Sequence, residues 1–254
     1  MHLDIIALNL FRSLRLPWRR KANQERSVLF GSINYLNLLP FQIFMKQKLK
    51  NTRAKQAMIW KRSTPSEMNS LFHKHKIDAA FISSVTTRKS SCMDLGIVAD
   101  GEVLSVILIP GKKVDDRESA TSNILARVLD LEGEVIIGDK ALTLKRQDRK
   151  SLDLAAEWKK STKLPFVFAR LCYNEKKRLI SKLAKEFSKR KHKIPVYYLK
   201  KAAHNGNITE KELLDYLSRI SYDLGWREKK SLYIFLKKSR SIAPKARRYN
   251  KKIG

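Results

Sequence analysis

The sequence lacks any apolar run of the roughly 18–20 residues that a membrane-spanning helix needs, so no transmembrane segment is expected. It has only two cysteines, Cys92 and Cys172, which give neither a disulfide framework nor the spacing of a metal site. We expect both to be ordinary buried or half-buried thiols in a reducing compartment. No repeat of about 20–50 residues is apparent. The 254 residues suffice for one large domain or for two lobes of about 100–150 residues each.

Several motifs that mark common enzyme classes are also missing. There is no Walker loop, no G-x-G-x-x-G and no G-x-S-x-G. Of the five histidines only His73 and His75 lie close together, and this pair lacks a third ligand. Cys172 has no histidine nearby in the sequence that would activate it as a nucleophile. We therefore expect no metal site and no cofactor.

Acidic side chains are scarce: 24 Asp and Glu stand against 54 Lys and Arg, which gives a net charge of +30. Such a charge suggests nucleic acid, but no RRM, helix-turn-helix, KH or zinc-finger signature occurs. Much of the charge falls on helix-like segments such as 175–191, where a solvated face explains it. The basic end of the chain suits non-specific phosphate contacts at most. We expect no specific nucleic-acid partner, and the charge also suits attraction of a dianionic substrate.

Residues 1–27 are expected to form an N-terminal extension. Their positive charges follow the apolar part instead of preceding it, unlike a secretory signal. The apolar residues have near-helical spacing, so a basic amphipathic helix on anionic lipid is one alternative. A loose extension ahead of the first strand is the other, and we favour it. A cytoplasmic location is expected.

Short apolar runs alternate with amphipathic ones, which is typical of an α/β fold. Proline near 40 and the hydroxyl residues at 63–64 and 209 mark helix starts. The sequence predicts strands at 28–33, 57–60, 78–82, 101–110, 134–137, 164–169 and 195–199, and helices beginning at 41 and spanning 64–72, 119–129, 152–158, 176–191 and 209–224.

The order of these elements predicts two lobes with a cleft between them. Two long apolar strands, 103–109 and 165–170, bracket the middle of the chain and are interpreted as crossovers between the lobes. Lobe 1 is then discontinuous, with residues 28–103 and 171–254, and lobe 2 comprises residues 104–170.

Two pairs of hydroxyl residues come where helices are expected to begin. Ser83 and Ser84 follow a strand, and Thr121 and Ser122 open the helix at 119–129. Free backbone N–H groups and the helix dipole bind carboxylates at such places. Plain N-capping is the alternative for each pair. In open α/β sheets ligands bind at the carboxyl ends of strands, so two such pairs favour an anion site.

Asn34 and Asn37 lie in a loop after the first strand, and Asp139 lies in a Gly-Asp turn after another. The asparagines are either turn residues or hydrogen-bond partners for a substrate oxygen. Asp139 is either a structural cap or a part of the cleft. No acid–base pair is evident, so any chemistry here must need little help from strong side chains.

The motifs, taken in order, resemble the chorismate dehydratases of menaquinone biosynthesis by the futalosine route. They are GSINYLNLLP, DAAFISSV, GIVADGEVLSVIL, the run 116–122, VIIGDKAL and DLAAEWKKSTKLPFVFA, and the resemblance covers residues 28–235. It implies a periplasmic-binding-protein-like fold of type II used for catalysis in the cytoplasm. The chain departs from the family at Lys163, where glycine is usual, and in residues 1–27.

The resemblance implies a hydro-lyase that removes water from chorismate to give 3-[(1-carboxyvinyl)oxy]benzoate. It assigns Asn37 and Ser84 as the catalytic residues. The residues it implies for substrate binding are Ser32, Asn34, Ser83, Ser105, Thr121, Ser122 and Asp139. Two alternatives are a non-catalytic solute-binding protein for a small carboxylate and the sister enzyme dihydroxynaphthoate synthase. No signal peptide supports the first, and the serine-proline-cysteine start of the second is missing.

Overall fold

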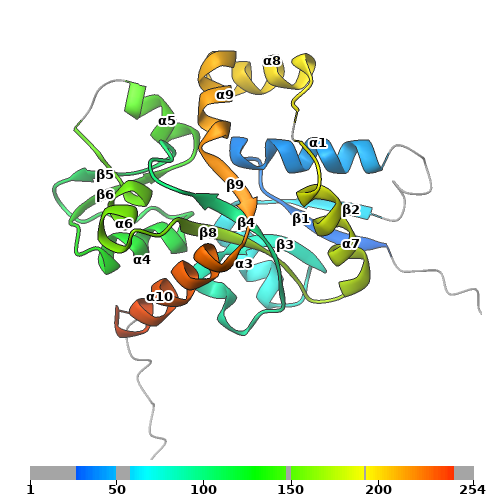
Figure 1. The fold of residues 1–254 in the computed structure, drawn as a ribbon, viewed down its shortest axis with the longest axis horizontal. Coiled ribbons are helices and arrows are strands. Elements are labelled where there is room, and N and C mark those ends of the chain that lie inside the picture. The colour runs from blue at the N-terminus through cyan, green and yellow to red at the C-terminus, as the bar shows by residue number, and fades with distance from the viewer. Residues whose placement is uncertain (1–26, 50–57, 147–149, 192, 243–254) are drawn as a thin grey trace, which may run out of the picture.

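The computed structural model describes residues 27–49, 58–146, 150–191 and 193–242. Expectations for residues 1–26 and for the basic end beyond 242 lie outside this range. Strands alternate with helices over most of the chain, as predicted (Figure 1). Within the described residues, no helix is both long enough and apolar enough to cross a membrane.

The larger sheet has six strands in the order β2-β1-β3-β8-β4-β9. β1 is parallel to β2 and β3, whereas β8 runs antiparallel to β3 and β4. α3 packs against β3, α7 against β4, and α10 against β8. The strands are β1 Val28–Ser32, β2 Met58–Arg62, β3 Ala79–Ser83, β4 Cys92–Ala99, β8 Phe166–Tyr173 and β9 Ile220–Asp223, and the helices along them are η1 Leu36–Leu38, α1 Leu39–Lys48, α3 Pro65–His73, η2 Ser84–Lys89, α7 Lys177–Ser188, α8 Val196–Asn205, α9 Glu210–Ser218 and α10 Trp226–Ile242.

The smaller sheet has three antiparallel strands in the order β6-β5-β7. Its elements gather at the left of Figure 1, away from β1 and β2. α10 packs against α4 as well as β8, so this helix contacts elements of both parts. The lobe boundaries given above stay a prediction. The elements of this part are β5 Val106–Pro110, α4 Ala120–Val128, β6 Gly133–Ile137, α5 Asp139–Arg146, β7 Leu152–Asp153 and α6 Leu154–Thr162.

One hydrophobic core runs through both parts. Beside β1 and β3, the ring of Phe41 lies 5.0 Å from Phe81 and 5.2 Å from Phe187. Near α10, Trp158 lies 6.0 Å from Phe235 and donates a hydrogen bond of 2.8 Å to Ser231 Oγ. These aromatic contacts join segments far apart in the sequence and fix the sheets beneath the cleft.

Asp153 holds the segment that enters the smaller sheet. Its Oδ2 accepts hydrogen bonds from the backbone N–H groups of Val103 and Leu104, and its Oδ1 caps α6. β5 therefore begins only at Val106, later than the strand predicted from 101. Residues 100–105 form the connection between the sheets.

Lys163, the position where the resembling family usually has glycine, ends α6 in the left-handed conformation, with φ of 61°. Glycine adopts this conformation without steric cost, whereas a side chain adds about 1 kcal/mol. The departure from the family pattern is therefore accommodated as local strain at a helix end.

Two predicted elements are wrong. Residues 195–199 form the start of helix α8, because Pro195 serves as N-cap and Leu199, Ala202 and Ala203 bury one helical face. The helix predicted over 209–224 ends at Ser218, and β9 follows with alternating buried and exposed residues. The helix start predicted at Thr209 is confirmed, and it is a capping box. Of the two residues predicted for the other helix start, Ser63 and Thr64, the N-cap is Thr64.

The expectation of two free thiols is also wrong, because Cys92 and Cys172 form a disulfide. The two residues lie directly opposite each other on the antiparallel strands β4 and β8. Their sequence separation is 80 residues, so only the pairing of the strands reveals that the sulfurs meet.

Candidate active site

A small pocket, here called the inner pocket, opens where the two sheets meet. Its cavity volume is about 80 Å³. The loops after β1 and β6, the end of β3 and the start of α4 line it. Its polar lining residues are Asn37, Ser83, Ser105, Ser119, Thr121 and Ser122, and Ile97, Val106 and Phe168 form apolar walls.

Ser83 ends β3 and is fixed by a side chain that sequence reasoning missed. Asn69 on α3 accepts a hydrogen bond of 2.9 Å from the Ser83 backbone N–H and donates one of 2.9 Å to Ser83 Oγ. Asn69 is buried in an otherwise apolar helix face, so its sequence context gave no sign of this role. These two bonds hold Ser83, which lines the inner pocket, against α3.

The two predicted hydroxyl pairs meet in space. Ser84 opens η2, Thr121 lies in the first turn of α4, and their hydroxyl oxygens are 3.5 Å apart. The Val85 N–H donates to Thr121 Oγ1 at 3.4 Å. The N-cap of α4 is Ser119, and not Thr121 or Ser122. The Ser119 Oγ accepts a hydrogen bond from the Ser122 backbone N–H. The start of α4 is thus capped from within, while Thr121 faces the other helix start.

Ser84 lies behind this cluster. Its side chain has no exposed surface, and it is not among the residues that line the inner pocket. Thr121, whose hydroxyl lies 3.5 Å from that of Ser84, does line the pocket.

Asn37 and Ser105 are tied together by a buried tyrosine. Tyr216 on α9 donates a hydrogen bond of 3.0 Å to Ser105 Oγ, and the Asn37 side chain also hydrogen-bonds to Tyr216. Tyr222 donates to the Asn37 carbonyl at 2.8 Å. Burial raises the pKa of Tyr216, so its phenol is neutral at physiological pH. In the sequence Tyr216 looks like an ordinary apolar-face residue of a helix, so this role went unpredicted.

Tyr35 forms the wall that closes the inner pocket. Its hydroxyl donates a hydrogen bond of 2.5 Å to Glu118, which joins the loop after β1 to the segment before α4. The ring lies against Gly138, where an added Cβ would stand 3.3 Å from Tyr35 Cε1 and where φ is 68°. Burial and the bond to Glu118 raise the pKa of Tyr35. The Gly-Asp turn seen in the sequence therefore makes room for this ring.

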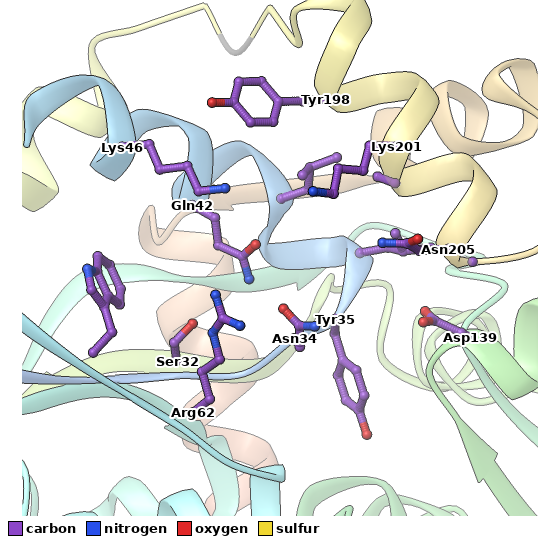
Figure 2. Close-up of a pocket in the computed structure, with 15 residues that line it drawn as sticks. Ser32, Asn34, Tyr35, Gln42, Lys46, Arg62, Asp139, Tyr198, Lys201 and Asn205 are labelled. Carbon is purple, nitrogen blue, oxygen red and sulfur yellow. The ribbon is translucent and has the colours of Figure 1, made fainter. Parts of the chain in front are cut away.

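On the other side of Tyr35 is a larger cavity of about 450 Å³, here called the outer chamber. Three of the predicted site residues, Ser32, Asn34 and Asp139, line it and do not line the inner pocket (Figure 2). Asp139 is the first residue of α5, where the helix dipole favours a carboxylate. Burial nevertheless raises the pKa of Asp139. The structure therefore divides the predicted residues between two neighbouring cavities, except for Ser84, which lines neither.

The inner pocket contains little that ionises. Of its lining residues in the described part of the chain, only Tyr35 has an ionisable side chain. No group of three His, Cys, Asp or Glu side chains that would hold a metal ion occurs among the described residues. The pocket instead offers hydroxyl and amide groups that bind a carboxylate or polarise a leaving hydroxyl.

The fold defines the class of protein. The chain superposes on a protein of Archaeoglobus fulgidus (TM-score 0.62, 12% identity, covering 85% of this chain and 97% of that one). It also superposes on the periplasmic aliphatic sulphonate binding protein of Escherichia coli (TM-score 0.56, 11% identity, covering 85% and 86%). The protein therefore has a periplasmic-binding-protein-like fold, which confirms the fold predicted from the sequence.

The family follows from the sequence. The sequence model of a family described as menaquinone biosynthesis matches residues 28–133 and 117–241. A chorismate dehydratase of Campylobacter jejuni is 40% identical over 220 residues, which cover 85% of this chain and 99% of the relative. The chain belongs to this menaquinone biosynthesis family, and the resemblance noted in the sequence is confirmed.

Proposed function

We propose that the protein is a chorismate dehydratase, which removes water from chorismate to form 3-[(1-carboxyvinyl)oxy]benzoate in menaquinone biosynthesis. The relative from Campylobacter jejuni supports this assignment. The observation that carries it is the inner pocket, where hydroxyl groups from two helix starts converge without an acid–base pair. Because this role is biosynthetic, we also propose a cytoplasmic location for the protein.

The reaction itself explains how such a pocket suffices. Loss of the ring C3 proton and the C4 hydroxyl makes the ring aromatic, which supplies a large driving force. The C3 proton is acidic because the diene conjugates C3 with the ring carboxylate. Negative charge therefore develops on that carboxylate, and fixed hydroxyl donors aimed at it lower the barrier.

The base is proposed to be the substrate's own enolpyruvyl carboxylate. A group held beside the proton it removes acts at a high effective concentration. Tyr35, the ionisable residue of the inner pocket wall, is a poor base because it is protonated. The protein's main task is then to hold the substrate in the conformation that brings this carboxylate to C3.

Asn37 and Ser84 are proposed to position the reacting carbon atoms and to assist departure of the C4 hydroxyl. Because Ser84 is fully buried beside Thr121, its hydroxyl is proposed to act through that of Thr121. Ser83 and Ser122, with Thr121, are proposed to bind the carboxylates.

Ser105, held by Tyr216, adds a further donor to the inner pocket. Ser32, Asn34 and Asp139 are proposed to meet the substrate in the outer chamber, on its way in.

The inner pocket has to widen to admit chorismate. Its volume of about 80 Å³ is below the roughly 300–1,000 Å³ of usual ligand pockets. The Tyr35–Glu118 hydrogen bond closes the wall between the two cavities. We propose that this bond breaks when substrate enters.

Mass spectrometry of purified protein incubated with chorismate tests the function. We expect a product lighter by one water, and greatly reduced turnover in Asn37→Ala and Ser84→Ala. Unchanged chorismate at high enzyme concentration would overturn the dehydratase assignment, and binding without turnover would indicate a solute-binding protein. Full turnover in both variants would overturn the site assignment alone.

A further inference from the structure

We propose that the outer chamber is a second binding site, which holds a flat aromatic dicarboxylate next to the inner pocket. On the proposed function, on which this inference rests, that ligand is the product of the dehydration. The chamber and the inner pocket share Tyr35 as a wall, so a molecule that leaves the inner pocket past Tyr35 enters the chamber.

Three cationic side chains from three different elements line the outer chamber. They are Lys46 on α1, Arg62 at the end of β2 and Lys201 on α8. Figure 2 shows all three directed toward the same space, with Gln42 between them. In the described part of the chain none of the three forms an ion pair. Three cations without acidic partners make the chamber attractive to a dianion.

Aromatic rings lie among these cations. Trp60, Tyr198 and Tyr35 all line the chamber. Lys46 Nζ lies 5.0 Å from the centre of the Tyr198 ring, which keeps its charge at the chamber wall. Trp60 is 36% exposed although its ring packs against Phe30 at 5.3 Å. Such walls favour a flat ring, because aromatic rings stack in offset or edge-to-face contacts.

The two cavities therefore differ in the ligand they suit. The inner pocket offers hydroxyls and an amide but no cation, which suits a substrate whose own carboxylate has to stay basic. The outer chamber offers full positive charges, with Asp139 as the sole carboxylate among its described lining residues. The product keeps both carboxylates of the substrate and gains a flat aromatic ring, so the cations and aromatic walls of the chamber draw it out of the inner pocket.

A hydrogen bond of Gln42 holds a polar side chain in a fixed position inside the chamber. The Gln42 Nε2 donates a hydrogen bond of 2.9 Å to the Ile33 carbonyl, which fixes the side chain across the chamber. The same loop carries Asn34 and Tyr35, so the wall of the chamber and the wall of the inner pocket belong to one segment.

Calorimetric titration of the full-length protein with the product tests the proposal. We expect two molecules per chain for the wild type. The triple variant Lys46→Gln/Arg62→Gln/Lys201→Gln loses one of them, with affinity at that site weakened at least about tenfold. The control Lys185→Gln/Lys230→Gln/Lys237→Gln removes three exposed charges elsewhere and keeps both. One site in the wild type, or equal weakening in the control, would overturn the proposal.

The same proteins separate this inference from the proposed function. Benzene-1,3-dicarboxylate serves as a probe that no dehydration produces, and its binding should depend on the same three cations. If it binds there while chorismate is not converted, the dehydratase assignment fails and the chamber stands. If chorismate is converted but product binding stays at one site, the chamber fails alone. Lys201→Gln serves as a single variant should the triple variant not fold.

Discussion

The phenol of Tyr216 donates a hydrogen bond of 3.0 Å to Ser105 Oγ and is itself fully buried under the inner pocket. Tyr216 thereby orients Ser105 and, through its bond to the Asn37 side chain, a proposed catalytic residue. A residue of the C-terminal half thus sets the geometry of two loops from the N-terminal half.

Replacing Tyr216 with Phe removes this hydrogen bond without leaving a large cavity. Because the side chains of Ser105 and Asn37 lose their bond to the buried Tyr216, we expect a loss of about 1–3 kcal/mol in the free energy of unfolding. We also expect kcat to fall at least about tenfold with a smaller change in KM. Steady-state kinetics and urea unfolding measure the two effects. Tyr233→Phe, at an exposed position, is the matched control and should change neither quantity. If Tyr216→Phe lost the expected stability but kept the wild-type kcat, Tyr216 would have a structural role only.

The rate should depend little on pH near neutrality. The inner pocket has no ionisable lining residue among those described except Tyr35, and burial and Glu118 raise its pKa. Carboxylates have unperturbed pKa values of about 4, so the substrate stays ionised. We expect kcat/KM to be flat between about pH 6 and 9. A bell-shaped profile centred near neutrality would mean that the protein supplies the base, contrary to the proposed mechanism.

Lys163→Gly should stabilise the protein. Lys163 has a φ of 61° at the end of α6, and glycine relieves strain of about 1 kcal/mol there. Ser161→Gly, two residues earlier within the helix, should instead destabilise by roughly 0.5 kcal/mol. Thermal and urea unfolding of both variants measure the difference. Equal destabilisation by the two substitutions would contradict the left-handed cap.

The Cys92–Cys172 disulfide should make a measurable contribution to stability. It closes a loop of 80 residues, for which chain entropy predicts about 4 kcal/mol of stabilisation. Protein unfolded without reductant should show no free thiol, and reduction should lower the free energy of unfolding while turnover persists. The matched variant is Cys92→Ser/Cys172→Ser. Two titratable thiols in unreduced, denatured protein would contradict the bond.

The local signals in the sequence predicted the hydroxyl residues best. Ser83, Ser84, Thr121 and Ser122 follow strand ends and helix starts that are legible from hydrophobic periodicity, and Thr121 and Ser84 do come together. The hydrogen-bond partner of Ser83 could not be predicted from the sequence, because Asn69 is 14 residues away along the chain and lies on a different element.

The wrong prediction at 195–199 and the missed outer chamber also arise from contacts between distant parts of the chain. Tyr197 and Tyr198 have high strand propensity, but the tertiary contacts of Leu199 and Ala202 favour a helix. The outer chamber escaped prediction because its cations come from α1, β2 and α8 and look like surface charge in the sequence. Fold class and family can be predicted because many local sequence patterns add up. Contacts between residues far apart in the sequence leave no such local pattern.

Elimination across C3 and C4 is tested directly with chorismate that carries deuterium at C3. We expect the purified protein to convert it to a product that has lost one water and all of the C3 deuterium, with the C4 oxygen gone from the ring. Unconverted chorismate, or a product that retains the deuterium, would contradict an elimination across C3 and C4 in the inner pocket.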